Sequence, residues 1–286
     1  MRALHDVPAP AKLNLFLHVV GRREDGYHLL QSAFTLLDWH DTLHFERRPQ
    51  GRLSREDVGG TPLPPDDLVL RAARALQSAT GCADGAHIVV EKRLPMQAGL
   101  GGGSSDAASC LLALNRLWGT GLGLPQLEKI GLSLGADVPF FLRGRNAWVE
   151  GVGERITPLE LPRARFLVVK PPQGLDTATI FRDPMLRRDS HPAILAGFAA
   201  NPLGFGHNDL EPVARRICPQ VQEALQWLGS QGLAGRMTGS GSAVFAPLAP
   251  GQAAPAAPAA WQGTWCVREC GNMEVHPLVG WAPSDD

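Results

Sequence analysis

Residues 94–109, LPMQAGLGGGSSDAAS, join a run of glycines to a serine pair and an alanine-rich segment. Glycine lets the backbone approach a ligand closely, so several N–H groups of this loop can point toward one bound anion. Ser104 or Ser105 is predicted to cap a helix that runs to about Trp118. The unpaired amides and positive dipole end of that helix would strengthen the anion site, and a di- or triphosphate is its predicted occupant.

This loop differs from two common phosphate-binding motifs. No GK[ST] follows the glycines, as it would in a Walker A loop, and no βαβ unit with a downstream acidic residue accompanies them, as in dinucleotide-binding proteins. The structural alternative is a flexible glycine turn before a capped helix. The length of the glycine run and the serine pair favour the phosphate loop.

The composition is that of a folded protein without a strong charge preference. Of 286 residues, 44% are apolar and 19% are charged, and the formal net charge is −1. No excess positive charge exists to attract a nucleic acid, and no apolar stretch approaches the roughly 18 residues that span a bilayer. We therefore expect no nucleic-acid and no membrane partner, no obligate protein partner is evident, and the cytoplasm is the expected location.

The five cysteines are too few and too scattered for a disulfide framework, so free thiols are expected. Cys266 and Cys270 with His276 could suggest a metal site. Zinc motifs, however, usually pair closely spaced ligands with a second such pair. The segment is therefore predicted to be a strand followed by a turn.

Apolar alternation predicts the first strands. They are expected at residues 12–20, 32–37, 42–47 and 87–91, with a turn at 38–41. Asp66 or Asp67 is predicted to cap a helix that ends at Gly81, and a further helix is predicted at Pro125 to Leu134.

The second half of the chain shows a similar mixture. Strands are expected at 147–152, 154–159, 166–169, 233–237 and 243–246, and a helix at 209–232, whereas prolines make a regular helix at 247–258 unfavourable. Helices that alternate with mostly antiparallel strands predict an α+β fold. A boundary near Leu161 gives two predicted domains, 1–160 and 161–286.

Four ordered motifs resemble those of the GHMP kinases, the family of galactokinase, homoserine kinase, mevalonate kinase and phosphomevalonate kinase. The glycine loop resembles the second motif of the family, and MTGSGSAVF at 237–245 resembles the third. PAKLNLFLHVVGRREDGYHLLQS at 10–32 and LGADVPFFLRGRNAWVEGVGE at 134–154 resemble one branch, the kinases that phosphorylate the C2 hydroxyl of 4-diphosphocytidyl-2-C-methyl-D-erythritol in the non-mevalonate isoprenoid pathway.

The resemblance covers most of residues 8–246. It implies a ribosomal-protein-S5-like N-terminal domain and a ferredoxin-like C-terminal domain, with ATP and a CDP-methylerythritol substrate meeting between them. For the nucleotide phosphates it implies contacts with Pro95, Gly99, Leu100, Gly101, Gly102, Gly103, Ser104 and Ser105.

The resemblance also assigns the catalytic residues. Asp137 alone would be interpreted as a turn or helix cap, but the matching aspartate in the family is the proposed general base. Lys12 alone would be interpreted as an exposed charge near a strand end, but the matching lysine pairs with that aspartate. Asn14 lies on the same strand face as Lys12 and can bond the acceptor hydroxyl.

The remaining predicted contacts concern the two bases and the metal. Tyr27 and His28 are expected to bind the cytosine, because a pyrimidine offers a stacking face and a hydrogen-bonding edge. Phe181 is expected on the opposite face of that base, with Thr177 nearby. The adenine is expected near Asp67, Leu68 and Asn115, although many relatives carry asparagine where this chain has Asp67. Mg²⁺ is expected with ATP, and Ser105 is its candidate ligand.

Two other functions stay open at this point. Another GHMP kinase with a different alcohol acceptor would share the glycine loop but would leave the motif at 10–32 without a purpose. A non-catalytic metabolite sensor on the same fold would not need Lys12 and Asp137.

Overall fold

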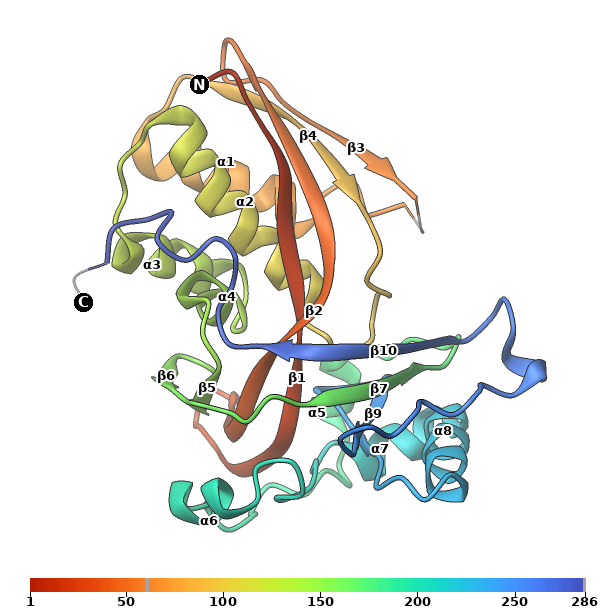
Figure 1. Cartoon of the computed structure of the whole chain (residues 1–286). Coiled ribbons are helices and arrows are strands. Elements are labelled where there is room, and N and C mark those ends of the chain that lie inside the picture. The colour runs from red at the N-terminus through yellow and green to blue at the C-terminus, as the bar shows by residue number, and fades with distance from the viewer. Residues whose placement is uncertain (60–61, 285–286) are drawn as a thin grey trace.

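The computed structural model describes residues 1–59 and 62–284 (Figure 1). Its strands are β1 Ala3–Arg22, β2 His28–Arg48, β3 Leu53–Val58, β4 Gly85–Glu91, β5 Ala147–Gly151, β6 Arg155–Pro158, β7 Arg165–Lys170, β8 Arg236–Met237, β9 Val244–Leu248 and β10 Cys266–Met273. Its helices are α1 Leu68–Thr80, α2 Gly102–Trp118, α3 Leu124–Leu134, α4 Val138–Arg143, α5 Thr177–Arg182, α6 Leu195–Ala200, α7 Glu211–Ile217 and α8 Pro219–Ser230, with a 3₁₀ turn at Ala259–Trp261.

One long antiparallel hairpin, β1 with β2, forms the centre of the molecule. Pairing runs from Ala3 opposite Glu46 to Arg22 opposite His28, with several register shifts. The turn predicted at 38–41 is wrong, because β2 continues through it. Asp41 is fully buried there, and its Oδ1 accepts hydrogen bonds from the backbone N–H groups of the two residues after Lys92, at 2.6 and 2.8 Å.

The hairpin carries strands from both halves of the chain. The sheet order is β3-β4-β2-β10-β7-β9-β8, while β1 and β5 also pair with β2, and β6 pairs with β5. Only β3 and β4 run parallel among these pairs. The α+β class, with mostly antiparallel strands, is therefore confirmed, and β10 links the two halves through Asn272 opposite Leu37.

Helices α1 to α4 lie together on one side of the hairpin, whereas α7 and α8 lie beside β7 and β9 (Figure 1). The first group covers a core that contains Phe45, Leu76, Leu111 and Phe140. A second core under α7 and α8 contains apolar residues of β7 and β9. A third joins the halves, because it contains Leu13, Leu15 and Trp39 of the hairpin together with Phe166 and Phe245.

The predicted helix limits were partly right. Asp67 caps α1 by accepting hydrogen bonds from the N–H groups of Val69 and Leu70, as predicted. The single helix predicted at 209–232 is wrong, since Cys218 has an extended backbone between α7 and α8. The physical reason is Pro219, which disfavours helical backbone at the residue before it.

The C-terminal segment returns to the N-terminal half. The backbone N–H of His276 donates to the carbonyl of Gly144 at 2.8 Å, and the N–H of Leu124 donates to the carbonyl of Pro283 at 2.7 Å. Leu278 is part of the core under α1 to α4. The domain limits 1–160 and 161–286 stay a prediction, and residues 285 and 286 lie outside the described residues.

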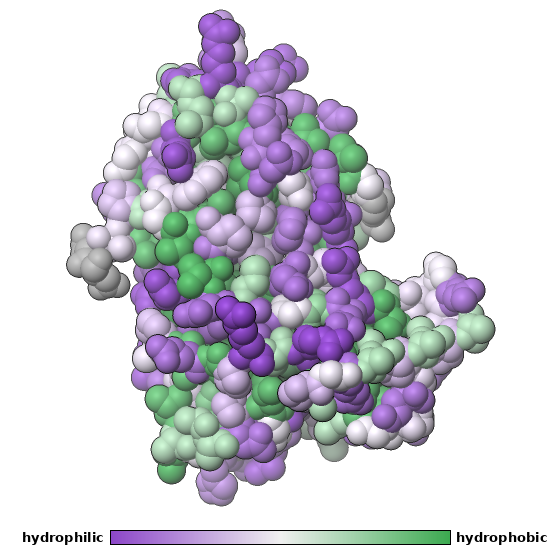
Figure 2. All heavy atoms as spheres, viewed as in Figure 1, coloured by the Kyte–Doolittle hydropathy of each residue, from purple (hydrophilic) through white to green (hydrophobic). Residues whose placement is uncertain are grey.

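Hydrophilic and hydrophobic residues are interspersed over the face in Figure 2. In the part of the chain that the structure describes, no helix combines the length and the apolar character needed to cross a bilayer.

Phe45 tests the core under α1 and α2. Its side chain is 1% exposed, so Phe45→Ala should lower the free energy of unfolding by about 3–5 kcal/mol through lost burial and a cavity. Val58 lies on the edge strand β3 of the same sheet and is 43% exposed. Val58→Ala should change the free energy of unfolding by no more than about 0.5 kcal/mol. Urea denaturation measures both, and similar losses in the two variants would contradict this assignment of the core.

Candidate active site

One cleft collects most of the residues that the sequence singles out. The lining includes Lys12, Asn14, Tyr27, His28, Asp67, Leu68, Pro95, Gly99, Leu100, Gly101, Gly102, Gly103, Ser104, Asp137, Thr177 and Phe181. Ser105 lies buried next to the lining, and Asn115 lies elsewhere. Asn115 instead bonds the side chain of Thr120 and the backbone of Leu122 after α2. The structure therefore does not bring Asn115 to the predicted adenine site.

The loop before α2 requires glycine at two positions. Gly99 has φ +73°, and a Cβ there would lie 2.1 Å from the carbonyl oxygen of Thr238. Gly101 has φ +72°, and a Cβ there would lie 2.9 Å from the ring of Phe141. A side chain at Gly99 would require the backbone of Thr238 to move, and one at Gly101 would require the Phe141 ring to move.

Helix α2 begins earlier than predicted. Gly101 is its N-cap, and no side chain caps it, so the prediction that Ser104 or Ser105 caps α2 is wrong. The left-handed backbone of Gly101 starts the helix, and the first intrahelical bond runs from the N–H of Ser105 to the carbonyl of Gly101 at 2.9 Å. The amides before Ser105 have no partner within the helix, and they lie at the cleft, where they can bind an anion.

Both halves of the chain hold this loop in place. The backbone N–H of Lys12 donates to the carbonyl of Leu100 at 2.9 Å, and that of Ala243 donates to the carbonyl of Ala98 at 3.1 Å. The Thr238 hydroxyl also donates to the carbonyl of Gly99 at 3.4 Å, so strand β1 and the turn at 238–241 both contact the glycine loop.

Lys12 and Asp137 come together across the cleft. The Lys12 Nζ lies 3.6 Å from the Asp137 Oδ2, and the Lys12 side chain is 4% exposed while that of Asp137 is 31% exposed. Asp137 is the N-cap residue of α4, but its side chain makes no capping hydrogen bond. Its carboxylate is therefore free to face Lys12 and the cleft.

Asn14 completes this group. Its Oδ1 accepts a hydrogen bond from the Lys12 Nζ, and its Nδ2 donates to the Ser32 hydroxyl at 2.9 Å. The backbone N–H of Asn14 donates to the Thr238 hydroxyl, also at 2.9 Å. Burial lowers the pKa of Lys12, and the neighbouring Asp137 charge acts against that shift.

Beside the glycine loop lies an ionic cluster that the sequence analysis missed, and two of its members, Lys92 and Asp106, line the cleft. The buried Lys92 Nζ donates to the Asp106 Oδ2 at 2.8 Å and also to Asp41. Burial raises the pKa of the Asp106 carboxyl to about 7; Lys92 acts against this shift and Asp41 adds to it. The only signal in the sequence was an aspartate inside the alanine-rich start of a helix.

Aromatic groups form the other end of the cleft. The rings of His28 and Phe181 are 5.0 Å apart between centroids and are tilted by 33°. Tyr27 is 65% exposed beside them, and the Thr177 and Ser240 hydroxyls share a hydrogen bond of 2.7 Å. These side chains leave a planar ligand room to contact aromatic faces.

Asp67 and Leu68 line the cleft at the start of α1. The Asp67 Oδ1 pairs with a guanidinium nitrogen of Arg55 at 2.6 Å in addition to capping α1. A Cβ at Gly103 would lie 3.4 Å from the Leu68 side chain, so Leu68 lies beside the first turn of α2. Arg55 was not found from sequence, because its pairing depends on how β3 packs beside α1.

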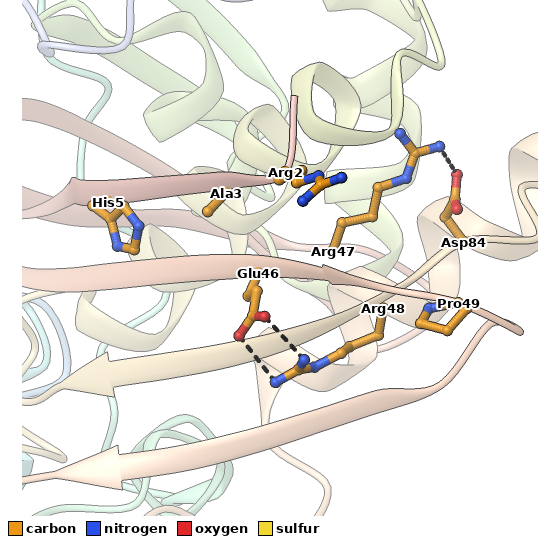
Figure 3. A pocket seen from close by; sticks show the side chains of 8 residues that line it. All are labelled: Arg2, Ala3, His5, Glu46, Arg47, Arg48, Pro49 and Asp84. Atoms are coloured by element: carbon orange, nitrogen blue, oxygen red, sulfur yellow. Dashed lines mark hydrogen bonds and ion pairs between the residues drawn. The ribbon is translucent and has the colours of Figure 1, made fainter.

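A second depression lies at the far end of the hairpin (Figure 3). It is lined by Arg2, Ala3, His5, Glu46, Arg47, Arg48, Pro49 and Asp84. Arg47 pairs with Asp84, and Arg48 pairs with Glu46. None of the residues predicted to be functional lines it.

Known proteins resemble the chain along its whole length. The model of the GHMP kinases N terminal domain matches residues 67–145, and that of the GHMP kinases C terminal region matches residues 193–265. The chain is 62% identical to the 4-diphosphocytidyl-2-C-methyl-D-erythritol kinase of Variovorax paradoxus (strain S110), over 99% of this chain and all of that protein. It is 64% identical to the kinase of that name from Delftia acidovorans (strain DSM 14801 / SPH-1), over 98% of each chain.

A solved structure agrees with these matches. The crystal structure of a 4-(cytidine 5′-diphospho)-2C-methyl-D-erythritol kinase superposes with a TM-score of 0.79 at 37% identity, over 93% of this chain and 98% of that one. The GHMP kinase fold implied by the four motifs is confirmed.

Gly99 provides a test of the loop geometry. A left-handed backbone costs a residue with a side chain about 1–2 kcal/mol. Gly99→Ala should lower the free energy of unfolding by more than this amount, because the new Cβ would also overlap the Thr238 carbonyl. Gly119→Ala is the matched control, since Gly119 has φ +69° and open space around it. Urea denaturation compares the two, and equal losses would contradict the close contact with Thr238.

Asp106 should make stability depend on pH. Its pKa is higher in the fold than the ordinary value of 3.8, so its contribution to stability is present below that value and is lost as pH rises through about 7. As pH rises from about 5 to about 8, the free energy of unfolding should therefore fall less in Asp106→Asn than in the parent. Urea denaturation at each pH measures this slope. Asp189→Asn, at an exposed carboxylate, should keep the parent slope, and an unchanged slope in Asp106→Asn would refute the prediction.

Proposed function

The chain belongs to the GHMP kinase family, and from this membership we propose that it uses ATP to phosphorylate the C2 hydroxyl of 4-diphosphocytidyl-2-C-methyl-D-erythritol. The observation that carries the proposal is the joint presence, in one cleft, of a phosphate loop, the Lys12 and Asp137 pair and an aromatic end. Full-length relatives at 62% and 64% identity bear the name of that kinase. The product would be an intermediate of isoprenoid precursor synthesis.

The nucleotide would bind with its phosphates on the glycine loop. The free amides at the start of α2 suit phosphate oxygens, and the helix dipole favours negative charge there. Pro95 and Ser104 line the same part of the cleft. Leu68, beside the first turn of α2, would contact the adenosine end, and Asp67, held by Arg55, would border it.

In the transfer step, the acceptor oxygen forms a bond to the γ-phosphorus as the bond from that phosphorus to the bridging oxygen of ADP breaks. We assign the hydroxyl proton to the Asp137 carboxylate, and ADP leaves with the electrons of the broken bond. Proton removal can come late in such a loose transition state, so Asp137 need not be strongly basic.

Lys12 would serve as the fixed cation of this step. Its Nζ lies 3.6 Å from the Asp137 carboxylate and donates to Asn14. A buried cation in this position orients the base and stabilises negative charge that develops on the transferring group. Asn14 would bond the acceptor hydroxyl once substrate displaces part of this network.

Magnesium is proposed as the partner of the ATP phosphates. The Ser105 Oγ and the Asp106 Oδ1 are buried and have no hydrogen-bond partner among the described residues, and both are oxygen atoms of the kind Mg²⁺ binds. These two residues would hold the ion, with phosphate oxygens and water as its other ligands. When bound, the ion would neutralise phosphate charge.

The acceptor would place its cytosine between Tyr27 and Phe181 and against His28. Aromatic faces bind a planar base by stacking, and His28 supplies a hydrogen-bonding group. Thr177 would contact the same part of the acceptor. Binding energy from this end would hold the C2 hydroxyl near Asp137 and so raise the rate by orientation.

The test is phosphate transfer from ATP and magnesium to the CDP-bearing methylerythritol, with mevalonate and homoserine offered in parallel. Only the first should be phosphorylated. Asp137→Asn should lower kcat by about 10²–10⁴-fold, with the KM for ATP near that of the parent, because the substitution keeps the shape and removes the base. Asp84→Asn, at a carboxylate of the second depression (Figure 3), should leave kcat unchanged.

Other outcomes would select the remaining hypotheses. Transfer to mevalonate or homoserine would keep the kinase activity and overturn the acceptor. Binding of nucleotide without transfer to any acceptor would support a metabolite sensor. A fully active Asp137→Asn enzyme would overturn the role of Asp137 as base.

A further inference from the structure

Arg188 lies in the cleft next to His28 and has no role in the steps above. It follows α5 in the chain, far in sequence from the start of β2. The inference drawn from it rests on the proposed function, because it concerns how the pyrimidine of the acceptor is recognised.

The guanidinium of Arg188 is fixed by backbone carbonyls. One terminal nitrogen donates to the carbonyl of Leu186 at 2.9 Å, and the other donates to those of Asp183 at 2.8 Å and Phe181 at 3.2 Å. These bonds leave the Nε–H as the donor aimed at His28, and the Arg188 Nε lies 3.0 Å from the His28 Nε2. A guanidinium held at so many points keeps its plane and direction when a ligand arrives.

This contact decides which nitrogen of His28 carries the proton. Arginine only donates hydrogen bonds, so the His28 Nε2 must accept and is unprotonated. In the neutral imidazole the proton then resides on Nδ1. The His28 Nδ1 has no hydrogen-bond partner among the residues that the structure describes, and His28 lines the cleft beside Phe181.

We propose that Arg188 is a positioning residue for base specificity, which fixes His28 in the Nδ1–H tautomer so that it donates to the ring acceptor of a cytosine. Cytosine has an unprotonated ring nitrogen at position 3 beside its carbonyl oxygen, whereas uracil has an N–H at that ring position. A fixed donor therefore accepts cytosine and meets another donor in uracil. The opposite tautomer would reverse this preference.

The charges around His28 support a neutral ring. Burial lowers the pKa of His28, and the cationic Arg188 and Arg22 lower it further. The ring of Phe181, which packs against His28, carries no charge. A neutral ring is needed here, because a protonated His28 could not accept the bond from Arg188.

The first test is ¹⁵N NMR of the full-length protein labelled at histidine, with His28→Gln identifying the His28 signals. The parent should show a protonated Nδ1 and an acceptor Nε2. In Arg188→Met, which removes the donor, the Nε2–H form should become populated and the pKa of His28 should rise. A parent protein with a protonated Nε2 would overturn the proposal.

The second test is calorimetric binding of CDP and UDP, which does not require turnover. The parent should prefer CDP, and Arg188→Met should weaken CDP binding by about tenfold, as expected for one lost hydrogen bond of about 1.4 kcal/mol. Its KM for the cytidyl acceptor should rise by a similar factor, with the KM for ATP unchanged. Arg188→Lys, which keeps the charge but not the planar donor, should not restore binding. Full restoration would overturn the proposal.

Two further variants separate positioning from loss of structure. Arg187→Met removes the neighbouring arginine, which pairs with the exposed Asp189, and should bind CDP like the parent. In a His28→Gln background, Arg188→Met should have little further effect, because Arg188 acts through His28. An equal additional loss in that background would show a merely structural role and overturn the proposal.

The two proposals can fail separately. If the parent prefers CDP and shows the expected tautomer but transfers no phosphate, the proposed kinase activity fails and the recognition by His28 stands. If it transfers phosphate but Arg188→Met leaves both the tautomer and CDP binding unchanged, the role of Arg188 fails and the kinase activity stands.

Discussion

The close backbone contact between Gly99 and the Thr238 carbonyl is the constraint on which the site depends. A Cβ at Gly99 would lie 2.1 Å from that oxygen, so the phosphate loop can approach the turn from the second half only through glycine. The bonds from Lys12 to Leu100 and from Ala243 to Ala98 hold the same loop from two sides. The glycine loop and strand β1 therefore keep one relative position, and in the proposed reaction phosphate and acceptor would meet between them.

Charged side chains beside that loop form two groups. In the first, the buried Lys12 faces the partly exposed Asp137, which leaves the carboxylate accessible from the cleft. In the second, Lys92 lies between Asp41 and Asp106. One buried cation between two carboxylates leaves negative charge in a poorly solvated place, and this explains why the pKa of Asp106 is raised to about 7. A cation that arrives with ATP would relieve this charge.

In the proposed recognition at the aromatic end of the cleft, specificity would depend on a residue that need not touch the ligand. Phe181 and Arg188 come from the same region around α5, and both contact His28 from the start of β2. In the proposed recognition, the segment that supplies a stacking ring would also supply the group that orients the histidine. Specificity for the base would then depend on the position of this segment.

Local features of the sequence were sufficient to identify the glycine loop, the cap at Asp67, most strands and the order of the four motifs, because these depend on neighbouring residues. They did not place the start of α2 at Gly101, the continuation of β2 through 38–41 or the position of Asn115. The sequence by itself determined the fold class, and the chemistry that it predicts for the site stays a proposal. Only the tertiary structure decided the pairing of Lys92 with Asp41 and Asp106 and of Arg188 with His28, because such contacts arise when distant segments pack together and bury their charges.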